Sequence, residues 1–182
     1  MKYYIIAGEV SGDMHAANLI AEIKRKDPRA EIRAWGGDRM KEQGVTLVKH
    51  IRHMAFMGFV EVVANLHKVI GNIRECKKDM VAFQPDAVIL VDYPGFNLRM
   101  AKFAHEKGFR VFYYISPQVW AWKRRRVKKI KNSVDKMLVI LPFEEEFYKN
   151  YGVDVTYVGN PTVDELAPVA AQPFDREAFC QK

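Results

Sequence analysis

An aspartate follows a run of apolar residues in the segment VDYPGFN at 91–97. Asp92 comes directly after AVILV, a run typical of a strand buried on both faces, so its carboxylate should emerge where that strand ends. A partly buried carboxylate in such a place can take the proton of a substrate hydroxyl, which is general base catalysis. An Asx turn or a helix cap is the ordinary alternative for Asp92. Asn97 likewise either caps the next helix or orients a ligand.

A second group of polar residues stands in GEVSGD at 8–13. Its glycines allow a tight turn and the close approach of a ligand to the backbone. The spacing is not that of a dinucleotide fingerprint, and its acidic residues would repel a pyrophosphate at a helix N-terminus. Ser11 and Asp13 are either helix caps or ligand contacts. Glu9 is harder to explain as a cap, which favours a hydrogen bond to a polyhydroxylated ligand.

A cluster of cations beside two tryptophans is the third candidate site. Seven of the nine residues at 123–131 are Lys or Arg, which equals the net charge of +7 on the whole chain. The amphipathic rings of Trp120 and Trp122 next to these cations suit an anionic surface, either lipid headgroups or nucleic acid. A solvated flank of a helix whose apolar stripe faces the core is the alternative. The cations that we assign to the surface are Arg124, Arg125, Lys128 and Lys129.

An unusually apolar segment, MAFMGFVEVV, occupies 54–63 and holds a single charge. Flexible Met and Phe side chains suit a surface that binds acyl chains. Ordinary core packing is the alternative. The candidates for an acyl-chain surface are Met54, Phe56, Met57 and Phe59.

Strand-like and helix-like patterns alternate along the chain and place these candidates. We expect strands at 3–7, 31–35, 46–49, 87–91, 111–115, 136–141 and 155–158. We expect helices at 13–26, 59–83, 98–107, 120–133 and 144–151. Such alternation predicts an α/β fold, a doubly wound, mainly parallel, Rossmann-like sheet with helices on both faces. Ligands bind outside the carboxyl ends of strands in these sheets, where GEVSGD and VDYPGFN should lie.

The composition limits the class of protein. With 182 residues, 49% hydrophobic and 28% charged, the chain is typical of a soluble globular protein. The apolar run at the N-terminus is too short for a signal peptide, and no run reaches the roughly 20 residues that span a bilayer. The five His and two Cys show no metal-ligand spacing. We therefore expect no metal and no cofactor, a cytoplasmic location, and peripheral contact with any membrane.

The periodic pattern stops after Thr162. We expect one domain at 1–165, followed at 166–182 by a linker with two prolines and the start of a further domain.

Six segments in order resemble lipid-A-disaccharide synthases, bacterial glycosyltransferases of the GT-B type. SPQVWAW together with VDYPGFN is the most specific part of the resemblance. The matching segments are GEVSGD at 8–13, MGFVEV at 57–62, VDYPGFN at 91–97, SPQVWAWKRRRVKKI at 116–130, LPFEEEFY at 141–148 and GNP at 159–161.

The resemblance implies a reaction and its partners. The family joins a UDP-diacylglucosamine donor to a diacylglucosamine phosphate acceptor at the cytoplasmic face of the inner membrane, with inversion and without a metal. Asp92 matches the family's candidate base. The apolar segment and the tryptophan-flanked cations would hold acyl chains and anionic headgroups, and no nucleic acid is expected. The residues that fall in motifs expected to bind substrate are Glu9, Ser11, Asp13, Asn97 and Ser116.

The resemblance also implies that a second half is needed. GT-B enzymes have two Rossmann-like domains, and the second holds most of the nucleotide-sugar donor. We therefore expect this chain to supply the acceptor half and to be inactive alone. Two alternatives stay open: another GT-B-type UDP-sugar enzyme such as an epimerase, and a non-enzymatic module that binds a lipid surface or nucleic acid.

Overall fold

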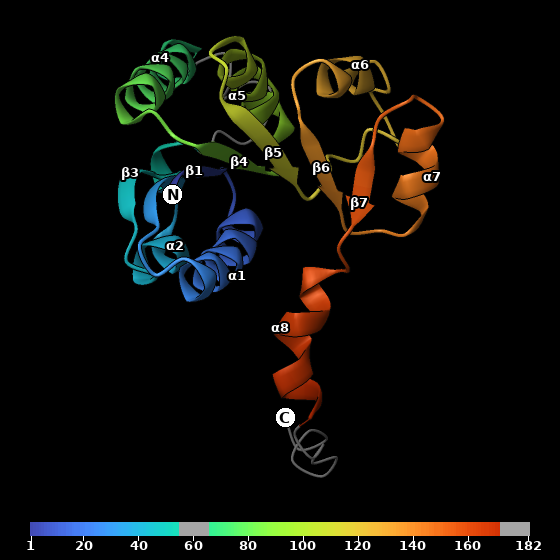
Figure 1. Cartoon of the computed structure of the whole chain (residues 1–182), viewed down its shortest axis with the longest axis horizontal. Helices are drawn as coiled ribbons and strands as arrows, with labels where there is room; N and C mark the ends of the chain where they lie inside the picture. The colour runs from blue at the N-terminus through green and yellow to red at the C-terminus, as the bar shows by residue number, and fades with distance from the viewer. Residues whose placement is uncertain (55–65, 172–182) are drawn as a thin grey trace.

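A parallel sheet forms the centre of the computed structural model, which describes residues 1–54 and 66–171 (Figure 1). In these residues the sheet has seven strands in the order β3-β2-β1-β4-β5-β6-β7. The strands are β1 (Lys2–Ala7), β2 (Glu31–Gly36), β3 (Thr46–His50), β4 (Ala87–Val91), β5 (Arg110–Tyr114), β6 (Lys136–Val139) and β7 (Val155–Tyr157).

Helices cover both faces of this sheet, as the alternating pattern predicts. Figure 1 shows α4, α5 and α6 on one face and α1 and α2 on the other. The helices are α1 (Val10–Lys26), α2 (Asp38–Glu42), α4 (Leu66–Phe83), α5 (Pro94–Glu106), α6 (Arg126–Lys131), α7 (Phe143–Lys149) and α8 (Pro161–Ala170), with a 3₁₀ turn η1 at Ile51–His53. The expected doubly wound α/β fold is confirmed.

The two faces of the sheet have separate apolar cores. Along β4, Val88 and Leu90 point into the core under α4 and α5, whereas Ile89 and Val91 point toward α1. All five residues of β4 are buried, which explains why this strand is a continuous apolar run.

The strand order reverses between β1 and β4. From β1 the chain proceeds through β2 to β3, and from β4 it proceeds in the opposite direction to β7. Helices that leave the two central strands on opposite faces open a crevice outside their carboxyl ends, where α/β proteins bind ligands. The two polar segments that follow β1 and β4 meet at this point.

Two expected segments differ from the structure, and a third agrees with it over its described part. The helix expected at 120–133 begins only at Arg126, because Lys123 has a φ of +59°, which interrupts a helix. Of the helix expected at 59–83, α4 covers the described part. The helix α8 runs across the boundary proposed at 165, so the first residues of the expected linker are helical.

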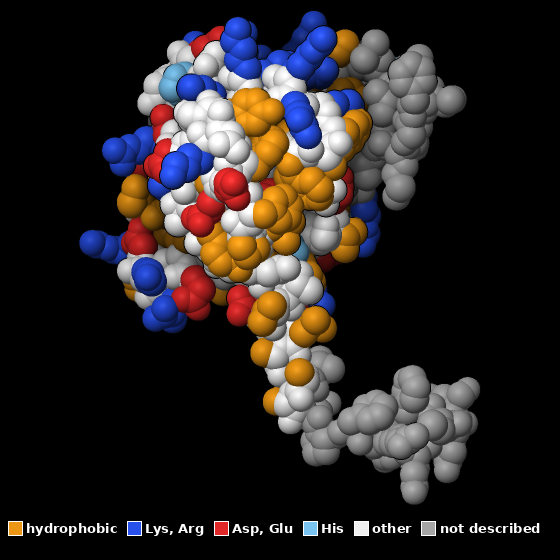
Figure 2. Space-filling view, turned by 90° about the vertical axis from the view of Figure 1, so that its right-hand side faces the viewer, with side chains coloured by type: hydrophobic (Ala, Val, Ile, Leu, Met, Phe, Trp, Pro, Cys, Tyr) orange, Lys and Arg blue, Asp and Glu red, His pale blue; other side chains and the backbone are white. Residues whose placement is uncertain are grey.

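Helix α8 projects away from the sheet (Figure 1) and carries apolar side chains along its length (Figure 2). Val163 is 64% exposed and Leu166 57% exposed. In the described parts of the chain, none of the helices is both long and apolar enough to cross a membrane.

Candidate functional site

The loop after β4 holds Asp92 in an uncommon backbone conformation. Asp92 has a φ of +43° and Tyr93 a φ of +47°, the left-handed region that residues other than glycine seldom adopt. Two such residues in succession store strain, and strain of this kind gathers at functional sites. The surrounding contacts must therefore hold the loop in place.

Buried side chains clamp the backbone of Asp92. Its carbonyl oxygen accepts hydrogen bonds from the Tyr113 hydroxyl at 2.6 Å and from the Asn97 side-chain amide at 2.8 Å. The Asn97 amide also donates to the carbonyl of Val91 at 3.1 Å, and the Asp92 N–H donates to the carbonyl of Tyr114 at 3.1 Å. Both Asn97 and Tyr113 are fully buried. Asn97 thus positions the backbone of Asp92. This role differs from both expectations for Asn97, a cap of the next helix and a direct contact with a ligand.

The environment of the Asp92 carboxyl suits a base near neutral pH. Burial raises its pKa to about 6, and the nearby carboxylate of Glu9 adds to the shift, while the backbone N–H of Tyr93 opposes it. Glu9 itself is exposed at the end of β1. The two carboxylates from separate motifs therefore act on each other at the crevice.

Tyr93 fits against Gly8 and joins the two motifs. A Cβ atom on Gly8 would lie 2.1 Å from Cδ1 of the Tyr93 ring, so a side chain at this position would collide with the ring. The Tyr93 hydroxyl donates to the carbonyl of Met54 at 3.2 Å. The sequence did not identify the roles of Tyr93 and Tyr113, because each contacts a residue that is distant in the sequence: Tyr93 packs on Gly8, and Tyr113 bonds to the carbonyl of Asp92.

We predict that Gly8→Ala destabilises the protein by about 1–3 kcal/mol, the usual cost of overpacking, because the Tyr93 ring must move. Gly95→Ala is the matched control, since nothing lies within 4 Å of a Cβ there and Gly95 lies inside α5. Thermal unfolding of both variants tests this. Equal stability of the two variants would show that the Gly8–Tyr93 contact is unimportant.

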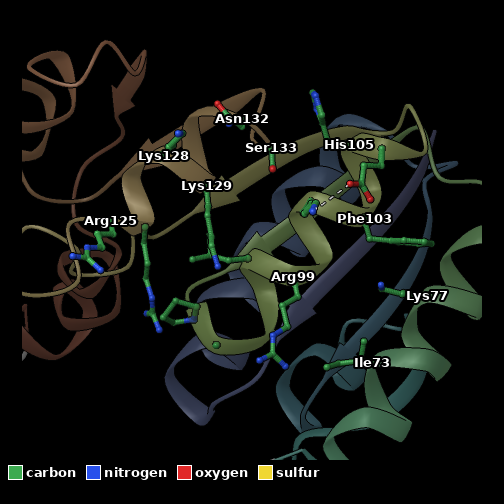
Figure 3. A pocket seen from close by; sticks show the side chains of 16 residues that line it. Ile73, Lys77, Arg99, Phe103, His105, Arg125, Lys128, Lys129, Asn132 and Ser133 are labelled. Atoms are coloured by element: carbon green, nitrogen blue, oxygen red, sulfur yellow. Dashed lines mark ion pairs between the residues drawn. The ribbon is translucent and has the colours of Figure 1, made fainter.

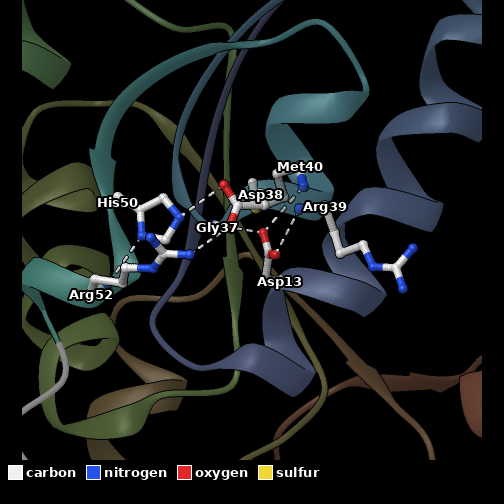
Figure 4. Close-up of polar contacts among 7 residues, drawn as sticks. All are labelled: Asp13, Gly37, Asp38, Arg39, Met40, His50 and Arg52. Carbon is white, nitrogen blue, oxygen red and sulfur yellow. Dashed lines mark hydrogen bonds and ion pairs between the residues drawn. The ribbon is translucent and has the colours of Figure 1, made fainter.

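Asp13 has a structural role. It is 3% exposed, and its carboxylate accepts hydrogen bonds from the backbone N–H groups of Gly37 at 2.6 Å, Arg39 at 3.0 Å and Met40 at 3.2 Å (Figure 4). It therefore caps α2, a helix distant in sequence, and not α1, on which it lies. We leave Asp13 out of the substrate contacts for this reason.

Ser116 is also buried, which argues against its expected place among the substrate contacts. Its hydroxyl lies 2.6 Å from the hydroxyl of Tyr148, and it donates to the carbonyl of Pro117 at 3.1 Å. Burial raises the pKa of Tyr148 to about 12, so that side chain is a neutral hydrogen-bonding group. Ser116 therefore joins the end of β5 to α7. Ser11, in contrast, is exposed beside Glu9 at the start of α1.

The residues expected to face a membrane divide into buried and exposed ones. Met54 is 2% exposed and belongs to the core, which agrees with the alternative of ordinary core packing for this residue. Trp120 is half-buried and packs edge-to-face on Phe143, with ring centroids 5.0 Å apart. Trp122 is 58% exposed, and the ammonium of Lys123 lies 3.9 Å from its ring centroid. Phe56, Met57 and Phe59 lie outside the described residues.

The four cations assigned to the surface, Arg124, Arg125, Lys128 and Lys129, are all exposed. Three of them, Arg125, Lys128 and Lys129, line one groove.

The described residues offer no candidate metal centre. Among residues 1–54 and 66–171, no group of three or more His, Cys, Asp or Glu side chains could hold a metal ion.

The model of the lipid-A-disaccharide synthetase family matches residues 3–180. The chain belongs to this family. It is 46% identical over 168 residues to the lipid-A-disaccharide synthase of Syntrophus aciditrophicus, an alignment that covers 92% of this chain and 44% of that protein. It is 45% identical over 175 residues to that of Geobacter metallireducens, covering 96% of this chain and 46% of the relative. The chain thus spans less than half the length of these relatives.

Solved structures share the fold at low sequence identity. A UDP-N-acetylglucosamine 2-epimerase superposes with a TM-score of 0.70 at 10% identity, covering 100% of this chain and 54% of the epimerase. The Methanocaldococcus jannaschii UDP-GlcNAc 2-epimerase, in complex with UDP-GlcNAc and UDP, superposes with a TM-score of 0.68 at 15% identity. The superposition covers 98% of this chain and 53% of that epimerase. The glycotransferase of kitacinnamycin superposes with a TM-score of 0.59 at 14% identity, and the superposition covers 87% of this chain and 51% of that protein. The synthase-family chain therefore has the fold of one half of these GT-B-type proteins.

Proposed function

We propose that this chain is the acceptor half of a lipid-A-disaccharide synthase and that Asp92 is its general base. The observation that carries the proposal is the Asp92 carboxyl, whose pKa is raised to about 6 on a clamped backbone at the reversal of strand order. Family membership gives the reaction class. The likeness to epimerases is a likeness of fold only.

The chemistry assigns one proton transfer to this chain. Asp92 accepts the proton of the acceptor hydroxyl as its oxygen attacks the sugar carbon of the donor. The bond from that carbon to the UDP oxygen breaks on the opposite side, the electron pair leaves with UDP, and the configuration inverts. Glu9 and Ser11 are exposed next to the end of β1, where they can bind sugar hydroxyls. Asn97 and Tyr113 keep Asp92 in place.

The substrates in this proposal are a UDP-diacylglucosamine donor and a diacylglucosamine phosphate acceptor. The second domain of the full-length protein would hold most of the donor. We also propose peripheral association with the cytoplasmic face of the inner membrane. The exposed ring of Trp122 beside exposed cations supports this, because such rings settle at the headgroup level of a bilayer and cations are attracted to anionic lipids.

An assay of the full-length protein tests the function. The protein is incubated with UDP-diacylglucosamine and diacylglucosamine phosphate, and mass spectrometry should detect the tetraacyl disaccharide phosphate together with UDP. A parallel incubation with UDP-N-acetylglucosamine tests the epimerase alternative. Epimerised sugar without disaccharide would contradict the proposal.

We predict that kcat/KM of the full-length protein falls about tenfold per pH unit below pH 6. The base must be ionised to accept a proton, and a pKa raised to about 6 means that half of the Asp92 carboxyls are protonated at about pH 6. Glu9→Gln should move this acid limb to lower pH, because it removes the negative charge that helps raise the pKa of Asp92. A pH–rate profile of both proteins is the measurement. An acid limb that stays in place in Glu9→Gln would contradict the coupling.

A further inference from the structure

A groove of about 830 Å³ lies between α5 and α6 (Figure 3). It reaches Pro94 and Gly95, the two residues that follow the Asp92–Tyr93 pair, and extends along α5 to His105. One end of the groove is thus next to the candidate catalytic loop in the chain. It is separate from the Asp92 carboxyl, which is not among its lining residues.

The walls of the groove carry a high density of positive charge. Seven of its 16 lining residues are Lys or Arg, and they come from separate parts of the chain. Lys77 comes from α4, Arg99 and Lys102 from α5, and Lys128 and Lys129 from α6. Figure 3 shows Lys129 reaching from α6 toward α5. A solvated helix flank would not gather cations from three helices around one hollow.

Few carboxylates neutralise this charge. Glu106 is the one acidic residue of the lining, and it lies 3.6 Å from the ammonium of Lys102. In the described parts of the chain, the ion pairs include none made by Arg99, Lys128 or Lys129. Like charges in a shared hollow repel one another, so the groove favours an anionic ligand.

The same groove has apolar surface beside the cations. Leu98 is buried, and Ile73 and Phe103 are half-buried in its lining. A ligand that matches both features has an anionic head and an apolar part. A phosphomonoester carries about two negative charges near neutral pH and three acceptor oxygens, which suit Arg and Lys donors.

We propose that the groove binds a lipid phosphomonoester, with its phosphate between Arg99 and Lys129 and its apolar part along Leu98 and Phe103. Arg99 lies five residues beyond Pro94, so the phosphate would lie about 7–8 Å along the helix axis from the start of α5. This binding does not depend on glycosyl transfer and goes beyond the proposed function. The phosphate can belong to the acceptor or to a membrane phospholipid, which the experiment below distinguishes.

The test is a calorimetric titration of the full-length protein with short-chain phosphatidic acid below its micelle concentration. The groove variant combines Arg99→Gln with Lys129→Gln. The control variant combines Lys26→Gln with Lys41→Gln, which removes the same charge from exposed residues on α1 and α2 that do not line the groove. We expect the groove variant to bind on the order of 10–100-fold more weakly and the control variant to change less than about threefold. Equal losses in both variants, or a loss in neither, would overturn the proposal.

Two further measurements identify the ligand. Inorganic phosphate should bind at least about tenfold more weakly than the lipid, because it leaves the apolar wall unused; equal affinities would overturn the assignment to a lipid. The acceptor KM of the groove variant in detergent micelles distinguishes the sources, and this arm alone rests on the proposed function. A raised KM with unchanged kcat assigns the site to the acceptor phosphate. An unchanged KM with weaker phosphatidic acid binding assigns it to a membrane phospholipid.

Discussion

Asp92→Asn is expected to lower the turnover of the full-length protein by a factor of ~10²–10⁴, the usual contribution of a general base. Asparagine keeps the size of the side chain but cannot accept the proton. Asparagine also tolerates a positive φ, so the strained backbone at +43° should survive the change. The clamp on the backbone is made to the carbonyl oxygen of residue 92, which the substitution does not touch.

The control for this prediction removes a carboxylate elsewhere. Asp154→Asn removes the same charge from a side chain that is 88% exposed and pairs with Lys136. Asp154 is distant in sequence from both β1 and β4. It should leave turnover within about twofold of the wild type, because exposed ion pairs contribute little. Circular dichroism and thermal unfolding establish that both variants fold. A folded Asp92→Asn protein with turnover close to that of the wild type would remove Asp92 from the role and make Glu9 the next candidate.

The sequence predicted the central strands and the position of Asp92 at the end of one of them, because these signals are local. β4 is a continuous apolar run buried on both faces, and Asp92 is the polar residue that ends it. The alternation of strand and helix patterns was enough to predict the doubly wound sheet, since parallel strands need crossover connections. The reversal between β1 and β4 then brings Glu9 and Asp92 together.

Contacts between distant residues could not be predicted in this way. Asp13 caps a helix that begins 25 positions later, and Ser116 lies against Tyr148, 32 positions later. A motif shows that these polar residues stand together in the sequence but not whether they face a substrate or a buried backbone. Asp13 and Ser116 are both buried in the structure, so their side chains bond to groups inside the protein and do not face a substrate.

The basic cluster shows both the strength and the limit of sequence patterns. Six of the seven cations at 123–131 are exposed, as their charge predicts, whereas Val127 and Ile130 between them are buried. The sequence did not show that Arg99 and Lys102 on α5 share a groove with the run, because the crossover from α5 to α6 through β5 brings these helices side by side. The groove is a property of the packing and not of a single segment.

Asp13→Ala is expected to destabilise the protein by about 2–4 kcal/mol, because it leaves buried N–H groups at the start of α2 without an acceptor. These groups belong to Gly37, Arg39 and Met40. Ser11→Ala is the matched control, since Ser11 is exposed on the same helix and its loss should change stability by less than about 0.5 kcal/mol. Hydrogen exchange locates the effect: the amides of Gly37 and Met40 should exchange much faster in Asp13→Ala, whereas those of β4 should change least.

A second variant, Asp13→Asn, studied beside Asp13→Ala, distinguishes a structural role for Asp13 from a catalytic or binding one. If Asp13 caps α2, then Asp13→Asn should retain part of the stability, because its amide oxygen still accepts a hydrogen bond from a backbone N–H. Its acceptor KM should stay close to that of the wild type at a temperature where the variant is folded. A contrary result would be an Asp13→Ala protein as stable as the wild type, with unchanged amide exchange at Gly37 and a strongly raised KM. That outcome would return Asp13 to the substrate contacts and would mean that the cap on α2 contributes little to the fold.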